Sequence, residues 1–147
     1  MSPAMAHVGV TVADLERAVR FYTDGLGLEL AARQTSAAGY LALTGYPGLE
    51  IATAFVTAPG DGVRIELQEY RRVGDHGFRE PGTAPAGSSH ICLRVDDLTG
   101  ALARAEAAGG RRVTDPYPID SGMNEGGAAV YLRDPDGYTI ELFEPPP

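Results

Sequence analysis

A pairing of histidine with glutamate recurs in the two halves of the chain. His7 opens an alternating apolar run, and His90 opens a second run of matching pattern. Glu66 stands in an Ile-Glu-Leu frame late in the first half, and Glu141 stands in the same frame late in the second. Imidazole nitrogens and carboxylate oxygens suit borderline divalent ions such as Zn, Ni, Co, Mn or Fe. The recurrence predicts one metal site with these four residues as ligands.

The Ile-Glu-Leu frame indicates how each glutamate is presented. Side chains alternate between the two faces of a strand. If Ile65 and Leu67 face the core, Glu66 therefore projects from the opposite face. A carboxylate on a partly apolar sheet face is costly unless a cation neutralises it. The frame thus favours a bound cation over two solvated carboxylates.

Both halves predict the same order of elements. Each opens with a period-2 apolar strand, at residues 8–12 and 91–95. Asp14 and Asp97 follow as helix N-caps, with apolar residues at helical spacing after them. Further strand-like segments complete the halves: residues 28–34, 40–43, 51–56 and 63–69 in the first, and residues 112–114, 128–132 and 138–143 in the second. The order predicts an α+β fold of two tandem βαβββ modules.

The predicted modules form one domain over residues 1–147. Module 1 covers about residues 5–70, a linker rich in Gly and Pro covers about residues 71–89, and module 2 covers about residues 90–144. The linker holds His76, which has no counterpart in the repeat. We expect His76 to be exposed or to belong to a lid.

Composition narrows the classes of partner. The 147 residues carry a net charge of −8 and no basic stripe, which disfavours nucleic acid and anionic membranes. No apolar run is long enough to span a bilayer, and no secretory signal opens the chain, so we expect a cytoplasmic protein with a small-molecule substrate. The single cysteine, Cys92, lies in an apolar run, and we expect a buried, unreactive thiol.

Four motifs span nearly the whole chain. They are His7-x-Gly-Val-x-Val-x-Asp-Leu, Phe21-Tyr22-x-x-x-Leu26-Gly27-Leu28, His90-x-x-x-x-Val-Asp-Asp-Leu and Asp134-Pro-Asp-Gly-Tyr-x-Ile-Glu-Leu. This set resembles the vicinal oxygen chelate superfamily, which includes glyoxalase I, extradiol dioxygenases, methylmalonyl-CoA epimerase and antibiotic-resistance proteins. The resemblance implies cupped mixed sheets around a metal site and a homodimer. It also implies the His-Glu-His-Glu ligand set of glyoxalase-like members, which this chain matches at His7, Glu66, His90 and Glu141.

Several positions depart from particular members of that superfamily. Glyoxalase I has an Arg at the position of Thr11 and an Asn at the position of Tyr70, which argues against a glutathione thioester. Methylmalonyl-CoA epimerase has Gln at the position of Glu66, and its additional catalytic Glu aligns near Glu50. Extradiol dioxygenases use two His and one Glu around Fe(II), so Glu66 argues against that chemistry.

The residues and the resemblance together predict an isomerase, epimerase or lyase. The metal would polarise the carbonyl of a small hydroxy-ketone or acyl thioester. Glu141 or Glu66 would remove the neighbouring proton, which gives a metal-stabilised enediolate. Two alternatives stay open: an Fe(II) ring-cleaving dioxygenase of the extradiol type, and a non-catalytic resistance protein that binds a drug or metabolite.

Overall fold

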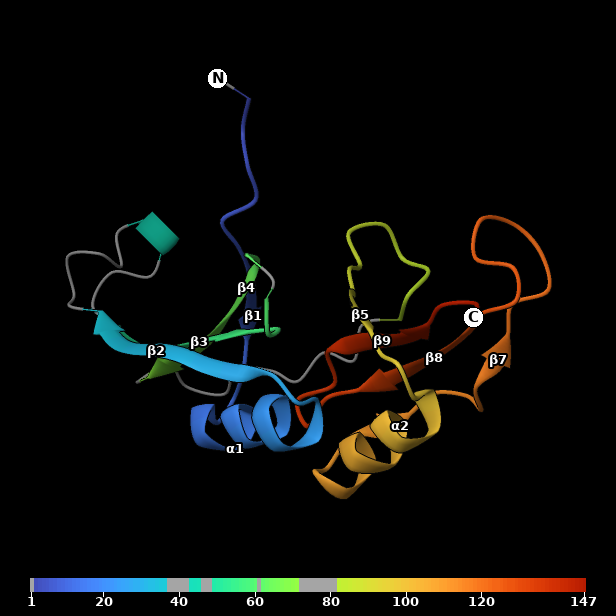
Figure 1. Cartoon of the computed structure of the whole chain (residues 1–147). Coiled ribbons are helices and arrows are strands. Elements are labelled where there is room, and N and C mark those ends of the chain that lie inside the picture. Colours follow the sequence, from blue (N-terminus) through green and yellow to red (C-terminus); the bar gives the residue numbers. More distant parts are fainter. Residues whose placement is uncertain (1, 37–42, 46–48, 61, 72–81) are drawn as a thin grey trace. The chain divides into compact units, whose positions relative to one another are not determined.

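The chain divides into two compact units, each built around one sheet (Figure 1). The computed structural model describes residues 2–36, 43–45, 49–60, 62–71 and 82–147. Unit 1 comprises Met1–Thr23 and Gly27–Gly77, and unit 2 comprises Asp24–Leu26 and Phe78–Pro147. The order of helices and strands confirms an α+β fold, with the predicted βαβββ order in the first half and one strand more in the second.

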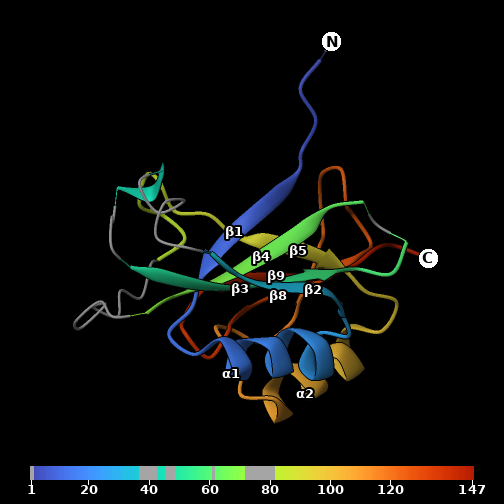
Figure 2. The same cartoon turned by 90° about the vertical axis from the view of Figure 1, so that its left-hand side faces the viewer.

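Unit 1 contains a four-stranded mixed sheet with one helix on one face (Figure 2). The strand order is β1-β4-β3-β2. Strand β1 runs parallel to β4, and the other pairs are antiparallel. The elements are β1 (His7–Thr11), α1 (Leu15–Arg20), η1 (Phe21–Gly25), β2 (Glu29–Ser36), β3 (Glu50–Thr57) and β4 (Arg64–Arg71).

The first helix begins as predicted and ends differently. The Asp14 carboxylate accepts a hydrogen bond from the Arg17 backbone N–H at 2.9 Å, which caps the N-terminus. After Arg20 the helix widens into the π-helical turn η1, which buries the adjacent residues Phe21 and Tyr22 completely. The wider turn allows two consecutive aromatic side chains to face the core, which a 3.6-residue period does not favour.

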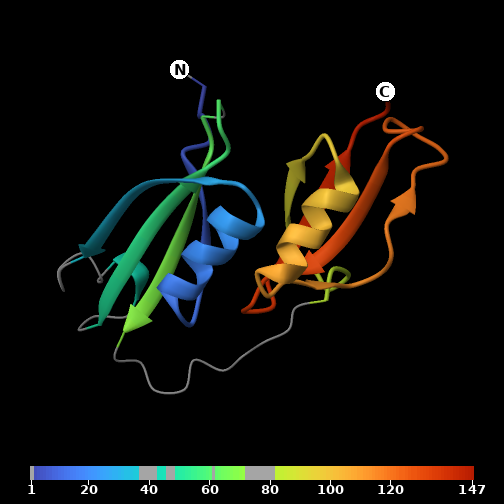
Figure 3. The same cartoon turned by 60° about the horizontal axis from the view of Figure 1, so that its bottom comes forward.

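Unit 2 repeats the arrangement, with an additional short strand (Figure 3). The strand order is β5-β9-β8-β6, and β7 pairs separately with β8. Strand β5 runs parallel to β9. The elements are β5 (Ile91–Arg94), α2 (Leu98–Ala107), β6 (Arg111–Arg112), β7 (Tyr117–Pro118), β8 (Ala128–Arg133) and β9 (Thr139–Glu144).

Each unit buries the helix-facing side of its sheet. In β4, Leu67 is fully buried and Ile65 is 5% exposed. In β9, Ile140 and Leu142 are buried in the same way. Because side chains alternate along a strand, Glu66 and Glu141 each project from the face of their sheet that is turned away from the helix, as the Ile-Glu-Leu frames predict.

Two expectations from the sequence change, and a third falls on residues that the structure does not describe. Of the predicted strand at residues 40–43, residues 40–42 lie outside the described residues and Leu43 lies in a 3₁₀ turn. His76 also lies outside the described residues. The expectation of a buried Cys92 is wrong, because Ile91 and Leu93 alternate with it and the cysteine faces away from the helix, where it is exposed. None of the helices in the described ranges is long and apolar enough to cross a membrane.

Candidate functional site

The first half of the candidate site is the contact between His7 and Glu66. The imidazole Nε2 lies 3.2 Å from the Glu66 carboxylate Oε2. In the parallel register Gly9 stands opposite Glu66, so His7 is one pleat away on the same face of the sheet. The Glu66 side chain is 9% exposed and that of His7 is 47% exposed, so solvent reaches the pair from the histidine side.

The second half of the site repeats this contact. His90 Nε2 lies 3.0 Å from Glu141 Oε2. Cys92 stands opposite Glu141 in the parallel register, at the position that Gly9 holds in unit 1. The Glu141 side chain is 21% exposed, more than that of Glu66. The repeat thus places one imidazole and one carboxylate together in each unit.

An aromatic ring lies edge-on to each histidine. Phe55 stands opposite Glu66 on β3, and its ring centroid is 6.4 Å from that of His7 at 69°. Tyr131 stands opposite Glu141 on β8, and its ring centroid is 5.2 Å from that of His90 at 82°. Edge-to-face rings at this separation attract one another and limit rotation of the imidazole.

The surroundings of Glu141 include two protic groups. Tyr131 on β8 and Cys92 on β5 stand opposite Glu141 in the strand register, so their side chains share its face of the sheet. Although Cys92 is exposed overall, partial desolvation of the thiol by its neighbours, assisted by the charge of Glu141, raises its pKa to about 11. Burial and then the same carboxylate also raise the pKa of the Tyr131 hydroxyl. Both groups are therefore neutral at pH 7.

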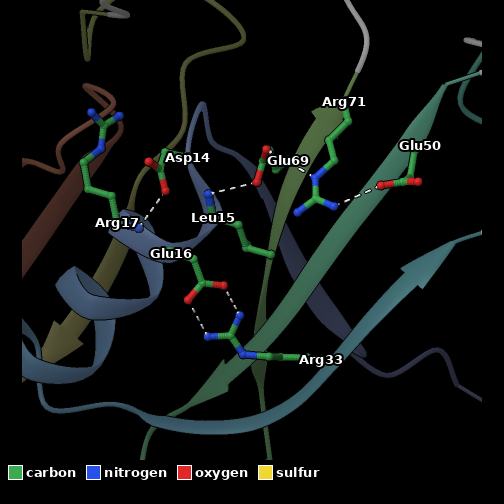
Figure 4. Close-up of polar contacts among 8 residues, drawn as sticks. All are labelled: Asp14, Leu15, Glu16, Arg17, Arg33, Glu50, Glu69 and Arg71. Atoms are coloured by element: carbon green, nitrogen blue, oxygen red, sulfur yellow. Dashed lines mark hydrogen bonds and ion pairs between the residues drawn. The ribbon is translucent and has the colours of Figure 1, made fainter.

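The opposite, helix-facing side of the first sheet carries a separate polar network (Figure 4). Glu69 Oε2 accepts a hydrogen bond from the Leu15 backbone N–H at 3.2 Å, and Arg71 Nη1 lies 3.0 Å from Glu50 Oε1. Glu50 pairs with Arg71 in the β3–β4 register, so it faces away from the side that carries Glu66. The structure therefore gives no support to Glu50 as a base acting beside Glu66.

The donor set fits a borderline divalent ion. Imidazole nitrogen and carboxylate oxygen are its usual protein ligands, and each pair brings one of each together, at 3.2 Å in unit 1 and 3.0 Å in unit 2. Two ligands from one unit are too few for a stable site. Across the part of the chain that the structure describes, no group of three or more His, Cys, Asp or Glu side chains could hold a metal ion. Each unit taken by itself therefore supplies two donors.

The four residues predicted from the sequence lie in these two His–Glu contacts, and sequence reasoning missed their neighbours. Tyr131 was not recognised, because its place beside Glu141 depends on the β8–β9 register. Cys92 could have been placed from the alternation of Ile91 and Leu93, which face the core on either side of it.

Comparison with known proteins gives consistent matches along the chain. The family model described as the Glyoxalase/Bleomycin resistance protein/Dioxygenase superfamily matches residues 4–142. The lactoylglutathione lyase of Haemophilus influenzae is 33% identical over 141 residues, which are 94% of this chain and 90% of that protein. The 2-epi-5-epi-valiolone epimerase of an Actinomyces species is 33% identical over 147 residues, which are 97% of this chain and 80% of that protein.

A solved structure gives the same result for the fold. A glyoxalase family protein from Bacillus cereus superposes with a TM-score of 0.82 at 23% sequence identity. The match covers 97% of this chain and 94% of that protein.

Proposed function

Because the chain belongs to the Glyoxalase/Bleomycin resistance protein/Dioxygenase superfamily, we propose that it is a metal-dependent isomerase, epimerase or lyase. Its reaction removes a proton next to the carbonyl of a small hydroxy-ketone or acyl thioester. The observation that carries the proposal is the repeated His–Glu contact, at 3.2 Å in unit 1 and 3.0 Å in unit 2. The lyase and epimerase among the relatives support an enzyme of this general class.

The proposed ligands are His7, Glu66, His90 and Glu141. Each pair combines nitrogen and oxygen donors, so the four together would suit Zn, Ni, Co, Mn or Fe. The proposal requires the two pairs to bind the same ion, either within one chain or between the two chains of a homodimer. A homodimer is part of the proposal, and measurement of the protein's molecular mass in solution tests it.

The chemistry divides between the ion and the protein. When bound, the ion would supply Lewis-acid polarisation of the substrate carbonyl. Glu141 or Glu66 accepts the proton from the adjacent carbon, and the C–H electron pair forms a C=C bond as the carbonyl oxygen takes the negative charge, which gives an enediolate. The glutamate then returns the proton. Return to the neighbouring carbon, with the hydroxyl proton passing to the former carbonyl oxygen, gives isomerisation. Return to the opposite face of the same carbon gives epimerisation.

Two residues on the site-facing side of the first sheet bear on the substrate. Thr11 shares the face of His7, and Tyr70 shares the face of Glu66. They stand where the resemblance to glyoxalase I implies an Arg that holds the glutathione carboxylate, at Thr11, and an Asn, at Tyr70. We therefore propose a substrate that lacks this carboxylate, with a hydroxy-ketone as the first choice.

The test combines metal analysis with hydrogen exchange. Elemental analysis of the purified full-length protein is expected to find one borderline divalent ion for each set of four ligands. In D₂O the loaded protein is expected to introduce deuterium next to the carbonyl of dihydroxyacetone, followed by proton NMR. Lactoylglutathione and propionyl-CoA serve as parallel thioester probes. A protein that binds no divalent ion, or that exchanges none of the three probes, would contradict the proposal.

The same preparation separates the two alternatives left open by the sequence. A ring-cleaving dioxygenase would consume oxygen with a catechol in the presence of Fe(II), which an oxygen electrode records. A drug-binding protein would bind its ligand stoichiometrically, form no product and still bind the ligand after chelation of the metal.

A further inference from the structure

A positively charged side chain shares the site-facing side of the second sheet with Glu141. Arg94 ends strand β5 and stands opposite Phe143, two residues beyond the register pair of Cys92 and Glu141. Because side chains alternate along a strand, Arg94 and Phe143 project from the same face as Glu141. The diagonal from Arg94 to Glu141 is about 8 Å between Cα atoms, which a small substrate and an extended arginine side chain span together.

The charge of Arg94 is available to a ligand. Its side chain is exposed and makes no hydrogen bond or ion pair with another residue in the described part of the chain. Two strand arginines on the helix side of the first sheet differ in this respect, because Arg33 pairs with Glu16 and Arg71 pairs with Glu50. Those arginines are neutralised within the fold, whereas Arg94 is not.

The neighbours of Arg94 on this face are apolar. Phe143 is half-buried, and its ring lies against the backbone of Gly127, where an added Cβ would be 3.1 Å from the ring carbon Cε2. Ala129 stands opposite Phe143 on β8 and has only a methyl side chain. Apolar groups beside a guanidinium lower the local dielectric constant, which strengthens its attraction to an anion.

The equivalent position in unit 1 is uncharged. Thr11 lies four residues after the histidine of its unit, as Arg94 does, and it stands opposite Gln68. The chain as a whole has a net charge of −8, so an anionic substrate is repelled unless a local cation offsets the repulsion. Arg94 supplies such a cation in unit 2, on the face that carries Glu141.

We propose that Arg94 is a specificity-determining residue, which binds an oxyanion of the substrate, a phosphate or a carboxylate, while the carbonyl end of that substrate lies at the His90–Glu141 pair. The inference rests on the proposed function and narrows its substrate to an anionic hydroxy-ketone. The planar guanidinium can donate two parallel N–H groups to two oxygens of such an anion. Arg94 takes no part in the proton transfer.

The experiment compares three hydroxy-ketones with the metal-loaded full-length protein in D₂O. Dihydroxyacetone is neutral, dihydroxyacetone phosphate carries a phosphate, and 5-hydroxylevulinate carries a carboxylate at a similar distance from the carbonyl. Deuterium exchange followed by proton NMR gives kcat and KM for each probe, after subtraction of the exchange in protein-free buffer. The quantity compared is the ratio of kcat/KM for an anionic probe to kcat/KM for dihydroxyacetone, because a general loss of structure slows all probes alike.

Four variants locate the oxyanion site. Arg94→Gln removes the charge, and Arg94→Lys keeps it without the planar fork. Arg104→Gln is the matched control, because Arg104 is an exposed arginine of the same unit on helix α2. Arg64→Gln tests the exposed arginine on the site-facing side of the first sheet, two residues before Glu66.

We expect the wild-type ratio to be about 10 to 100 for at least one anionic probe, the range that a charge-assisted hydrogen bond supplies. Arg94→Gln should lower this ratio about 10-fold or more, chiefly through a higher KM for the anionic probe. Arg94→Lys should retain part of the ratio. Arg104→Gln and Arg64→Gln should keep the wild-type ratio.

Three results would overturn the inference while leaving the proposed function intact. The first is a wild type that exchanges dihydroxyacetone as efficiently as both anionic probes. The second is an Arg94→Gln protein with the wild-type ratio, and loss of the ratio in Arg64→Gln would then place the oxyanion in unit 1. The third is exchange into thioester probes alone. A wild type that binds no divalent ion would instead remove the proposed function, and this inference with it.

Discussion

Glu66 and Glu69 lie three residues apart on strand β4 and project from opposite faces of the sheet. Glu66 contacts His7 on the site-facing side, while Glu69 accepts a hydrogen bond from the Leu15 backbone N–H on the helix side. Unit 2 repeats the second contact, because Glu144 Oε2 accepts from the Leu98 N–H at 2.6 Å. In each unit, one short strand thus positions a site residue and also satisfies the start of a helix.

Glu144→Ala is expected to destabilise the protein without removing its metal. The substitution leaves the Leu98 N–H, a donor at a helix start, without its carboxylate, at a cost of about 1–2 kcal/mol. The melting temperature should fall by roughly 3–6 °C for a chain of this size. Calorimetry measures the shift, with the exposed Glu29→Ala as control. Loss of bound metal at unchanged stability would contradict this division of roles.

His7→Ala and His90→Ala are expected to reduce metal binding to the same extent, although the two residues lie in different units. If four ligands hold one ion, removal of either imidazole weakens the same site. Titration of the metal-free protein with Ni²⁺ checks this, and His76→Ala, which lies outside the repeat, is the control. Two independent weak sites, each lost with only one of the histidines, would show that the pairs do not share an ion.

Much of this arrangement follows from local patterns in the sequence. The alternation in residues 8–12 and the Ile-Glu-Leu frames predict which side chains face the core, because a strand has only two faces. Asp14 and Asp97 predict the helix starts, since capping depends on neighbours within three residues. The His and Glu of each unit come together because the strands that carry them pair in parallel.

The remaining features depend on contacts that no local pattern encodes. Tyr131 reaches Glu141 only in the observed β8–β9 register, and a shift by one residue would place it on the other face. Strand β7 has two residues, too few to show a period. The π-helical turn follows from the burial of both Phe21 and Tyr22, which tertiary packing decides.

Glu141→Gln is expected to abolish turnover while the fold remains nearly intact. The amide is similar in shape to the carboxylate but cannot accept the substrate proton, so kcat should fall by about 10²–10⁴-fold. Deuterium exchange measures the loss, and circular dichroism confirms the fold. Glu125→Gln, at an exposed glutamate of the same unit, is the control. Full activity in Glu141→Gln would exclude Glu141 as the base.

The N-cap of helix α1 is expected to make part of the free energy of unfolding depend on pH. The hydrogen bond from the Arg17 backbone N–H, together with the nearby arginines, holds the pKa of Asp14 below its usual value of 3.8. A carboxylate with a lowered pKa in the folded state contributes stability above the unfolded pKa, and this contribution is lost as the pH falls through the folded pKa.

Asp14→Ala should therefore cost about 0.5–2 kcal/mol near pH 7, and the difference from wild type should shrink as the pH falls below about 4. Asp14→Asn keeps an accepting oxygen without a titrating group, so its stability relative to Asp14→Ala should hardly change with pH. Urea unfolding between pH 7 and pH 3 measures all three proteins. If the difference in free energy of unfolding between wild type and Asp14→Ala stayed constant down to pH 3, the cap would still stabilise the helix. Its contribution would then not depend on the charge of the carboxylate.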